Sequence, residues 1–309
     1  MKIGIVGLGD IAQKAYLPVI TQRDDLELVF CTRDPQTLAA LAGKYRIAET
    51  CQDYRQLPAM NVDAVMIHAA THVHFEIASF FLEQGIPTFV DKPLCDNAAQ
   101  VEQLYTLATR QQQPLYVGFN RRHIPLYNQY IPELAEQRLG ALRSLRWEKH
   151  RCAHPGDIQT FIFDDFIHPL DSVNLNHQSD LRDVDVRVQT QGQQLARIDV
   201  SWESGSTLLC ASMNRQFGTT SERVSACYDN HAFEFDSFVE GREWKSSEER
   251  HLKVKDWTPM LATKGFSAMI NDWVACVNTG TVASEVVERN IATHRLADAI
   301  YEQVIGQLA

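Results

Sequence analysis

The chain has 309 residues, of which 45% are hydrophobic and 22% charged, and its formal net charge is −10 at pH 7. This length exceeds what one hydrophobic core usually organises, and the composition is that of an ordinary globular protein, so we expect two domains. The acidic balance argues against a nucleic-acid partner, and no apolar run is long enough to span a bilayer. The seven cysteines are scattered without a CxxC pair, which favours reduced thiols and a cytoplasmic location.

Short apolar runs alternate with helical patterns in the first third of the chain. The pattern predicts strands at residues 2–6, 26–31, 64–68, 88–90 and 115–118. Helical periodicity covers residues 11–22, 35–45, 75–84 and 97–111. Continuous apolar strands separated by helices indicate a doubly wound parallel sheet that is buried on both faces.

After residue 118 the pattern changes to period-two alternation, first evident at residues 184–188 and 195–202. The pattern predicts further strands at residues 142–150, 207–213, 223–228 and 232–238, and helices at 266–278 and 285–308. Alternation over successive short strands indicates an α+β domain with a large open, mostly antiparallel sheet. We therefore expect residues 1–119 and 120–309 to form separate domains.

A glycine-rich turn, GLGDIA at residues 7–12, lies directly between the first strand and the first helix. In this context GxGxxA predicts a Rossmann-type dinucleotide-binding domain. Gly7 permits the turn, Gly9 lets the backbone approach a pyrophosphate, and Ala12 lets the helix pack close to the strand. N–H groups at the helix start, around Asp10 and Ile11, attract the negative charge. The expected cofactor contacts in this turn are Gly7, Gly9, Asp10, Ile11 and Ala12.

Thr32 and Arg33 follow the second strand, where such domains recognise the adenosine ribose. A hydroxyl followed by a guanidinium suits a 2′-phosphate, which favours NADP(H) over NAD(H). Asp34 is the competing candidate, because a carboxylate here would accept from a 2′-hydroxyl. The Asp34–Pro35 pair is also typical of a helix start.

Several segments together resemble the glucose–fructose oxidoreductase, inositol dehydrogenase and rhizopine-catabolism (Gfo/Idh/MocA) family, over nearly the whole chain. They are the glycine turn with the helix after it, residues 69–74 (AATHVH), Asp91-Lys92-Pro93, residues 117–122 (VGFNRR), and Asp164, His168 and Asp171 at the spacing of an Asp-x-Gly-x-His-x-x-Asp motif. Within the family, the GFNRRH string and the segment around Asp164 are most similar to the MviM subgroup.

The resemblance implies an oxidoreductase that moves a hydride between nicotinamide and a hydroxyl- or carbonyl-bearing carbon of a sugar, polyol or inositol-like metabolite. It implies that Lys92 hydrogen-bonds the reacting oxygen, that His168 is the general acid/base and that Asp164 holds its proton. It also implies a homodimer through the second-domain sheet. Further implied cofactor contacts are Ala70, Thr71, His74, Asp91, Lys92 and Asn120. The expected substrate contacts are Arg122, His150, Asp164 and Phe166.

Phe166 stands where the family motif has its inner glycine, so we expect a narrowed or redirected substrate pocket. The replacement also leaves a second hypothesis open, a non-catalytic regulatory or scaffold protein that binds a dinucleotide without turning it over. His68, His72 and His74 have a metal-like spacing, but no carboxylate or thiol accompanies them, and we expect no metal.

Overall fold

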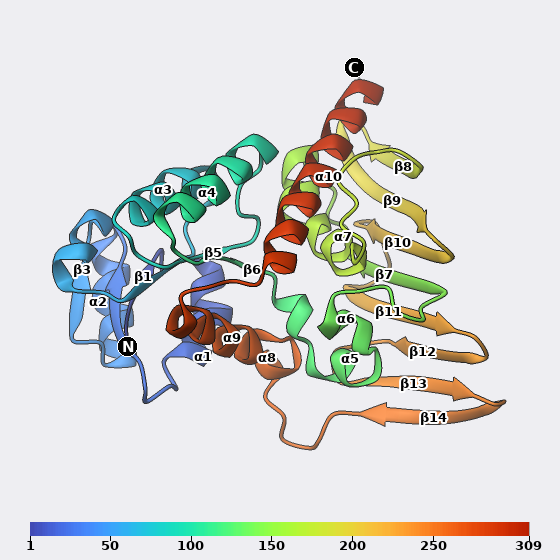
Figure 1. Cartoon of the computed structure of the whole chain (residues 1–309), viewed down its shortest axis with the longest axis horizontal. Coiled ribbons are helices and arrows are strands. Elements are labelled where there is room, and N and C mark those ends of the chain that lie inside the picture. The colour runs from blue at the N-terminus through green and yellow to red at the C-terminus, as the bar shows by residue number, and fades with distance from the viewer. Residues whose placement is uncertain (309) are drawn as a thin grey trace. The chain divides into compact units, whose positions relative to one another are not determined.

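The computed structural model describes residues 1–308, which form two compact units. The first consists of Met1–Gly118 and Phe266–Ser284, and the second of Phe119–Gly265 and the chain from residue 285 onward. Figure 1 shows a sheet in each unit. Residues 266–284 thus pack with the first unit, whereas the sequence boundary assigned them to the second. Aromatic contacts explain this, because Tyr16 meets Phe266 at 5.3 Å and Phe89 meets Trp273 at 5.9 Å between ring centroids.

The first unit contains a six-stranded parallel sheet in the order β3-β2-β1-β4-β5-β6. The strands are β1 (Lys2–Val6), β2 (Glu27–Cys31), β3 (Glu49–Cys51), β4 (Ala64–Ile67), β5 (Thr88–Asp91) and β6 (Leu115–Gly118). Their apolar side chains are almost wholly buried. Strand order reverses between β1 and β4, and the carboxyl ends at such a reversal are where open α/β sheets bind ligands. The predicted Rossmann sheet is confirmed.

Helices flank this sheet. They are η1 (Ala12–Tyr16), α1 (Leu17–Ile20), α2 (Pro35–Tyr45), η2 (Tyr54–Met60), η3 (Thr71–Val73), α3 (His74–Glu83), α4 (Ala98–Gln111) and α9 (Phe266–Thr279). α3 packs against α4, and α1 packs against α9. The helix after the glycine turn is π-helical over η1, where the sequence predicted a regular α-helix. Within residues 1–308, no helix combines the length and apolar character needed to cross a membrane.

The second unit contains an eight-stranded sheet in the order β14-β13-β12-β11-β7-β10-β9-β8. Only β7 and β10 pair in parallel, so the predicted, mostly antiparallel sheet is confirmed. The strands are β7 (Ser144–His150), β8 (Val184–Gln191), β9 (Gln194–Ser204), β10 (Thr207–Asn214), β11 (Ser221–Tyr228), β12 (His231–Phe235), β13 (Glu240–Lys245) and β14 (Glu248–Lys253). The hairpin β13–β14 was missed because its residues are largely charged.

The helices of the second unit are η4 (Asn120–His123), α5 (Pro125–Tyr130), α6 (Pro132–Glu136), η5 (Thr160–Phe166), α7 (Ile167–Val173), α8 (Met260–Thr263) and α10 (Ser284–Leu308). In Figure 1, α5, α6, α7 and α10 all lie on one side of the sheet. Alternate strand residues, among them Trp147, Val200 and Trp202, are buried. The intervening residues, such as Arg146 and Arg187, are exposed.

Candidate active site

The glycine turn between β1 and η1 has the geometry that a bound diphosphate needs. Gly7 has φ +89°, and a Cβ there would lie 2.7 Å from the backbone nitrogen of Ala69, so only glycine fits. Its N–H donates to the Cys31 carbonyl at 2.9 Å, which ties the turn to β2. A Cβ on Gly9 would meet nothing within 4 Å. The backbone at Gly9 is therefore open to a ligand beside the start of a helix.

A cavity of about 640 Å³ extends along this turn at the carboxyl ends of β1, β2 and β4. Five of the predicted cofactor residues line it: Gly7, Gly9, Thr32, Arg33 and Ala70. Other residues that line it were not predicted to contact the cofactor, among them Gln52, Asp53, Tyr54, Arg55, His68, His72 and Glu76. They come from the ends of β3 and β4 and from η2, η3 and α3, segments far apart in the sequence, so only the folded chain brings them together.

Asp34 and Arg33 have different surroundings at the end of β2. The Asp34 carboxylate caps α2, accepting from the N–H groups of Gln36 at 3.1 Å and Thr37 at 3.2 Å. Arg33 is exposed and lines the cavity. Arg55 also lines it, although its guanidinium already pairs with Glu76 at 2.8 Å. The helix-start interpretation of Asp34 is thus confirmed.

Asp91 fixes the backbone just before Lys92. Its Oδ1 accepts from the Tyr16 hydroxyl at 2.6 Å and from the Lys92 N–H at 2.9 Å. Burial raises the pKa of the Asp91 carboxyl, against the opposing effect of the nearby Lys92 charge. Lys92 itself is half-buried. Neither residue lines the cavity, so Asp91 acts here as a support for the Lys92 backbone.

His68 and His74, the two buried histidines near this turn, have separate contacts. His74 is buried, and its two ring nitrogens lie 2.9 Å from the carbonyl oxygens of Pro93 and Ala69, so it links two loops instead of lining the cavity. His68 stacks on Tyr16 at 4.0 Å, and burial lowers its pKa to about 3. Across residues 1–308, no three His, Cys, Asp or Glu side chains are placed to hold a metal ion together.

In the second unit, Asp164 and His168 lie on one continuous helical segment, with Asp164 on the π-helical stretch η5 and His168 in the first turn of α7. Asp164 is exposed and His168 is buried. The helical segment continues through Pro169, although a proline inside a helix removes a backbone donor. Pro169 has no N–H for the Asp165 carbonyl four residues back, and the Lys149 ammonium lies 3.5 Å from that oxygen instead.

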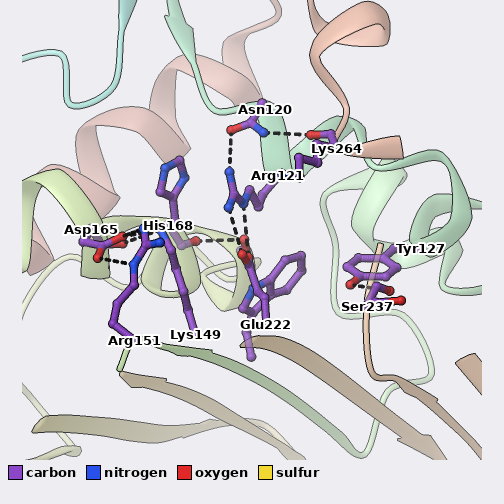
Figure 2. Close-up of polar contacts among 12 residues, drawn as sticks. Asn120, Arg121, Tyr127, Lys149, Arg151, Asp165, His168, Glu222, Ser237 and Lys264 are labelled. Atoms are coloured by element: carbon purple, nitrogen blue, oxygen red, sulfur yellow. Dashed lines mark hydrogen bonds and ion pairs between the residues drawn. The ribbon is translucent and has the colours of Figure 1, made fainter. Parts of the chain in front are cut away.

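Asp165, which the sequence analysis did not single out, is the buried carboxylate of this segment (Figure 2). It pairs with Lys149, Arg151 and Arg215. Burial alone would raise its pKa, but the charges of Lys149 and Arg151 outweigh burial and hold it well below its usual range. Burial lowers the pKa of Lys149 to about 7, against the attraction of Asp165.

Two of the four predicted substrate contacts have internal positions. The Arg122 guanidinium pairs with buried Asp171 through Nε at 2.9 Å and Nη2 at 2.6 Å. The Phe166 side chain is fully buried, so it packs in the core where a glycine would leave space. Both residues thus lie in the interior of the second unit, and their contact with a substrate stays a prediction.

His150 and Asn120 each make polar contacts within the second unit. Side chains alternate along β7, and Lys149 reaches η5, so His150 points to the other face of the sheet, where Glu148 lies 4.0 Å away. His150 therefore lies on the face of the sheet opposite η5, and its contact with a substrate stays a prediction. The Asn120 side chain donates to the Lys264 carbonyl at 2.7 Å and accepts from Arg121 at 3.1 Å (Figure 2). Its amide is thus engaged within the second unit.

The chain is similar to known protein families and to solved structures. Residues 1–119 match the family described as "Oxidoreductase family, NAD-binding Rossmann fold", and residues 125–243 match "YceM-like, C-terminal domain". A Salmonella typhimurium protein named "Putative oxidoreductase YceM" is 30% identical, with 99% of both chains covered. The crystal structure of a Gfo/Idh/MocA family oxidoreductase from Vibrio cholerae superposes with a TM-score of 0.98 at 59% identity, covering 99% of both chains. This chain belongs to the Gfo/Idh/MocA oxidoreductase family.

The subgroup resemblance is confirmed as well. A dehydrogenase (MviM) from Clostridium difficile superposes with a TM-score of 0.87 at 26% identity, with 99% of both chains covered. Several further relatives match about half of this chain, and these are named as inositol or glucoside dehydrogenases. The chain is an oxidoreductase with an NAD-binding Rossmann domain.

A nicotinamide dinucleotide fits the residues of this Gfo/Idh/MocA site. Gly9 presents open backbone beside a helix start, and the cavity continues past Thr32 and Arg33. The chemistry-bearing residues are divided between the units. Lys92 lies in the first, and Asp164 and His168 lie in the second.

Proposed function

We propose that this oxidoreductase transfers a hydride between a nicotinamide cofactor and the hydroxyl- or carbonyl-bearing carbon of a small polar metabolite, of the sugar, polyol or inositol class. The observation that carries the proposal is the cavity along the glycine turn, where Gly9 leaves its backbone open. When bound, the cofactor supplies the hydride-accepting ring. Everything else in the reaction falls to side chains of this chain.

In this proposal Lys92 and His168 both act on the reacting oxygen, in different roles. Lys92 donates a hydrogen bond to that oxygen, and its backbone is fixed by Asp91. His168 takes the hydroxyl proton during oxidation and returns it during reduction, because a neutral imidazole can accept a proton and its cation can give it back. Asp164, four residues earlier on the same helical segment, holds or shares that proton.

We further propose that NADP(H) is preferred over NAD(H). The Asp34 carboxylate caps α2 by accepting hydrogen bonds from its first N–H groups. Because Asp34 is engaged in this way, Arg33 is the better candidate for contact with the adenosine ribose. A guanidinium at that position favours a 2′-phosphate.

A homodimer through the sheet of the second unit is part of the proposal. On the face of β7 and β11 away from the helices, Arg146 and Arg223 are exposed and Glu148 is half-buried. Sedimentation equilibrium tests it, with a dimer mass expected and a monomer at micromolar concentration contradicting it.

Replacement of Lys92 tests the enzymatic proposal. Purified protein is screened with sugars, polyols and keto compounds by nicotinamide absorbance. With an active substrate, Lys92→Ala should lower kcat at least about 100-fold, while cofactor affinity measured by fluorescence titration stays within about threefold. The control is Lys44→Ala, at an exposed position on α2, which should change neither kcat nor cofactor affinity. Tight cofactor binding without turnover across the panel would favour the regulatory or scaffold protein instead.

A further inference from the structure

Four cationic side chains converge in the second unit: Arg121 from η4, Lys149 from β7, Arg151 just after β7, and Arg215 just after β10. We call these four residues the cationic cluster. Figure 2 shows three of them, Arg121, Lys149 and Arg151, together with His168. The proposed chemistry at His168 uses none of the four, and only Arg121 falls within a sequence motif, the VGFNRR segment.

Three members of the cluster share one carboxylate. Asp165 pairs with the Lys149 ammonium, with Arg151 through Nε and Nη2 at 3.1 Å each, and with Arg215 Nη2 at 3.0 Å. A carboxylate has only two oxygens, so each cation receives a fraction of its counter-charge. Arg215 has a further deficit, because its Nε is buried and has no hydrogen-bond partner among the described residues.

The fourth member has its own carboxylate. Arg121 donates to Glu222 through Nε at 3.1 Å and Nη2 at 2.8 Å. Glu222 also accepts from Trp147 Nε1 at 2.8 Å. Glu222 therefore pairs directly with Arg121, and its charge also acts on Lys149.

The cluster therefore carries an excess of positive charge. Four cations share Asp165 and Glu222, and the excess persists when Asp157, an exposed carboxylate within range of Arg215, is counted. The side chains of Lys149 and Arg215 are only 6% and 4% exposed. Buried charge without a partner is costly, so such an arrangement is best stabilised by an added anion.

The cluster is open to solvent on one side and lies next to the proposed acid/base. The Arg151 side chain is 38% exposed. Asp165, which gathers three of the cations, precedes His168 by three residues, so the two lie about one helical turn apart. A ligand that reaches Arg151 is then close to the segment that carries His168.

We propose that the substrate carries an anionic oxygen group, a carboxylate or a phosphate, which binds the cationic cluster and places the reacting carbon at His168. This inference rests on the proposed function, because it takes His168 as the proton-exchanging group. Guanidinium groups recognise both carboxylates and phosphates through paired hydrogen bonds.

The protonation of Lys149 provides a readout that does not depend on turnover. Its surroundings are Asp165 on η5, Arg121 on η4, Glu222 on β11 and Arg151 after β7, and burial together with the two arginines lowers its pKa to about 7. A bound anion raises that pKa, so binding is accompanied by proton uptake near neutral pH. Titration calorimetry in two buffers of different ionisation enthalpy measures the uptake.

The first experiment compares matched substrates. Cofactor-loaded enzyme is assayed with glucose, glucuronate and glucose 6-phosphate, and with inositol and an inositol phosphate. The carboxylate or phosphate member of each set should have the higher kcat/KM, and which of the two is favoured identifies the group. Arg151→Gln should raise KM for the anionic substrate by about 10- to 100-fold, the usual loss for one charge-assisted hydrogen bond. Arg146→Gln, an exposed position on β7, should leave it unchanged.

The outcomes separate this inference from the proposed function. A neutral substrate that is turned over best, with a KM unaffected by Arg151→Gln, would overturn the anionic group and leave the oxidoreductase proposal intact. Binding of an anionic substrate with proton uptake, but without turnover, would support the anionic group and overturn the oxidoreductase proposal. Lys149→Met should abolish the uptake. Should that variant fail to fold, Arg151→Gln still decides, because its side chain is partly exposed.

Discussion

The hydroxyl of Tyr16 donates a 2.6 Å hydrogen bond to Oδ1 of Asp91, which connects the helix after the glycine turn to the residue before Lys92. Both side chains are buried, and the same carboxylate oxygen also accepts from the Lys92 N–H. One buried contact thus joins the diphosphate turn to the segment that carries the proposed catalytic lysine.

Tyr16→Phe should remove this link and leave the ring in place. Because Asp91 then keeps a buried oxygen with one donor fewer, the free energy of unfolding should fall by about 1–3 kcal/mol, measured by urea denaturation. In the control, Tyr54→Phe, the lost hydrogen bond to Glu76 is exposed, and the change should stay below about 0.5 kcal/mol. Equal effects in the two variants would contradict a structural role for the Tyr16–Asp91 contact.

The two glycines of the turn should respond differently to a methyl group. Gly7→Ala forces a left-handed backbone and a contact of 2.7 Å with Ala69, and should cost at least about 2 kcal/mol of stability. Gly9→Ala meets nothing within 4 Å and should change stability by less than about 1 kcal/mol. Its Cβ nevertheless occupies the approach of the diphosphate, so cofactor affinity should fall more than about tenfold. Undiminished affinity in Gly9→Ala would place the cofactor elsewhere.

Asp164 and Asp165 are neighbours with different expected roles. Asp165→Asn leaves Lys149, Arg151 and Arg215 without their shared counter-charge, so the free energy of unfolding should drop by about 3–5 kcal/mol. Asp164→Asn, at an exposed position, should change it by less than about 0.5 kcal/mol and lower kcat for the active substrate. A stable Asp165→Asn protein would show that the cations are balanced by other means.

Arg33→Asp tests the cofactor preference. Loss of the guanidinium should weaken NADPH binding by about 10- to 100-fold, because a charge-assisted contact with the 2′-phosphate disappears. NADH affinity should change less than about threefold. Arg110→Asp makes the same charge change at an exposed position on α4 and serves as the control. Equal losses for both cofactors would remove the argument for NADP(H).

Stability should decline on mild acidification because of buried histidines. Burial lowers the pKa of His68 to about 3 and that of His294 to about 4, whereas an unfolded histidine titrates near 6.5. Between those values the unfolded chain binds more protons, so the stabilisation is complete above pH 6.5 and is lost as pH falls, by up to about 1.4 kcal/mol per pH unit for each histidine.

Replacement of one histidine isolates its share of that slope. His68→Phe keeps a ring against Tyr16 and should reduce the dependence of unfolding free energy on pH between 6.5 and 4 by about one proton. His251→Phe, at an exposed position on β14, should leave the slope unchanged. Identical slopes in wild type and His68→Phe would show that His68 is not held neutral.

Local patterns predicted much of the architecture. The parallel strands, the glycine turn, the helix start at Asp34 and the alternating strands of the second sheet each follow from spacing within a few residues, and the structure confirms them. The β13–β14 hairpin was not predicted from the sequence, because its strands are mostly charged and show no alternation of apolar and polar residues. The helix of residues 266–279 was predicted, but its assignment to the first unit depends on contacts with Tyr16 and Phe89 far away in the sequence.

The sequence by itself determined the family, the dinucleotide fold and the residues whose chemistry is local to a motif, because backbone periodicity and glycine positions act over short distances. Tertiary structure alone decided which charges meet. Asp165 and Asp164 are adjacent in the chain, yet one is buried among three cations and the other is exposed. Burial and charge pairing depend on strands and loops brought together from distant segments, and no spacing along the chain encodes that convergence.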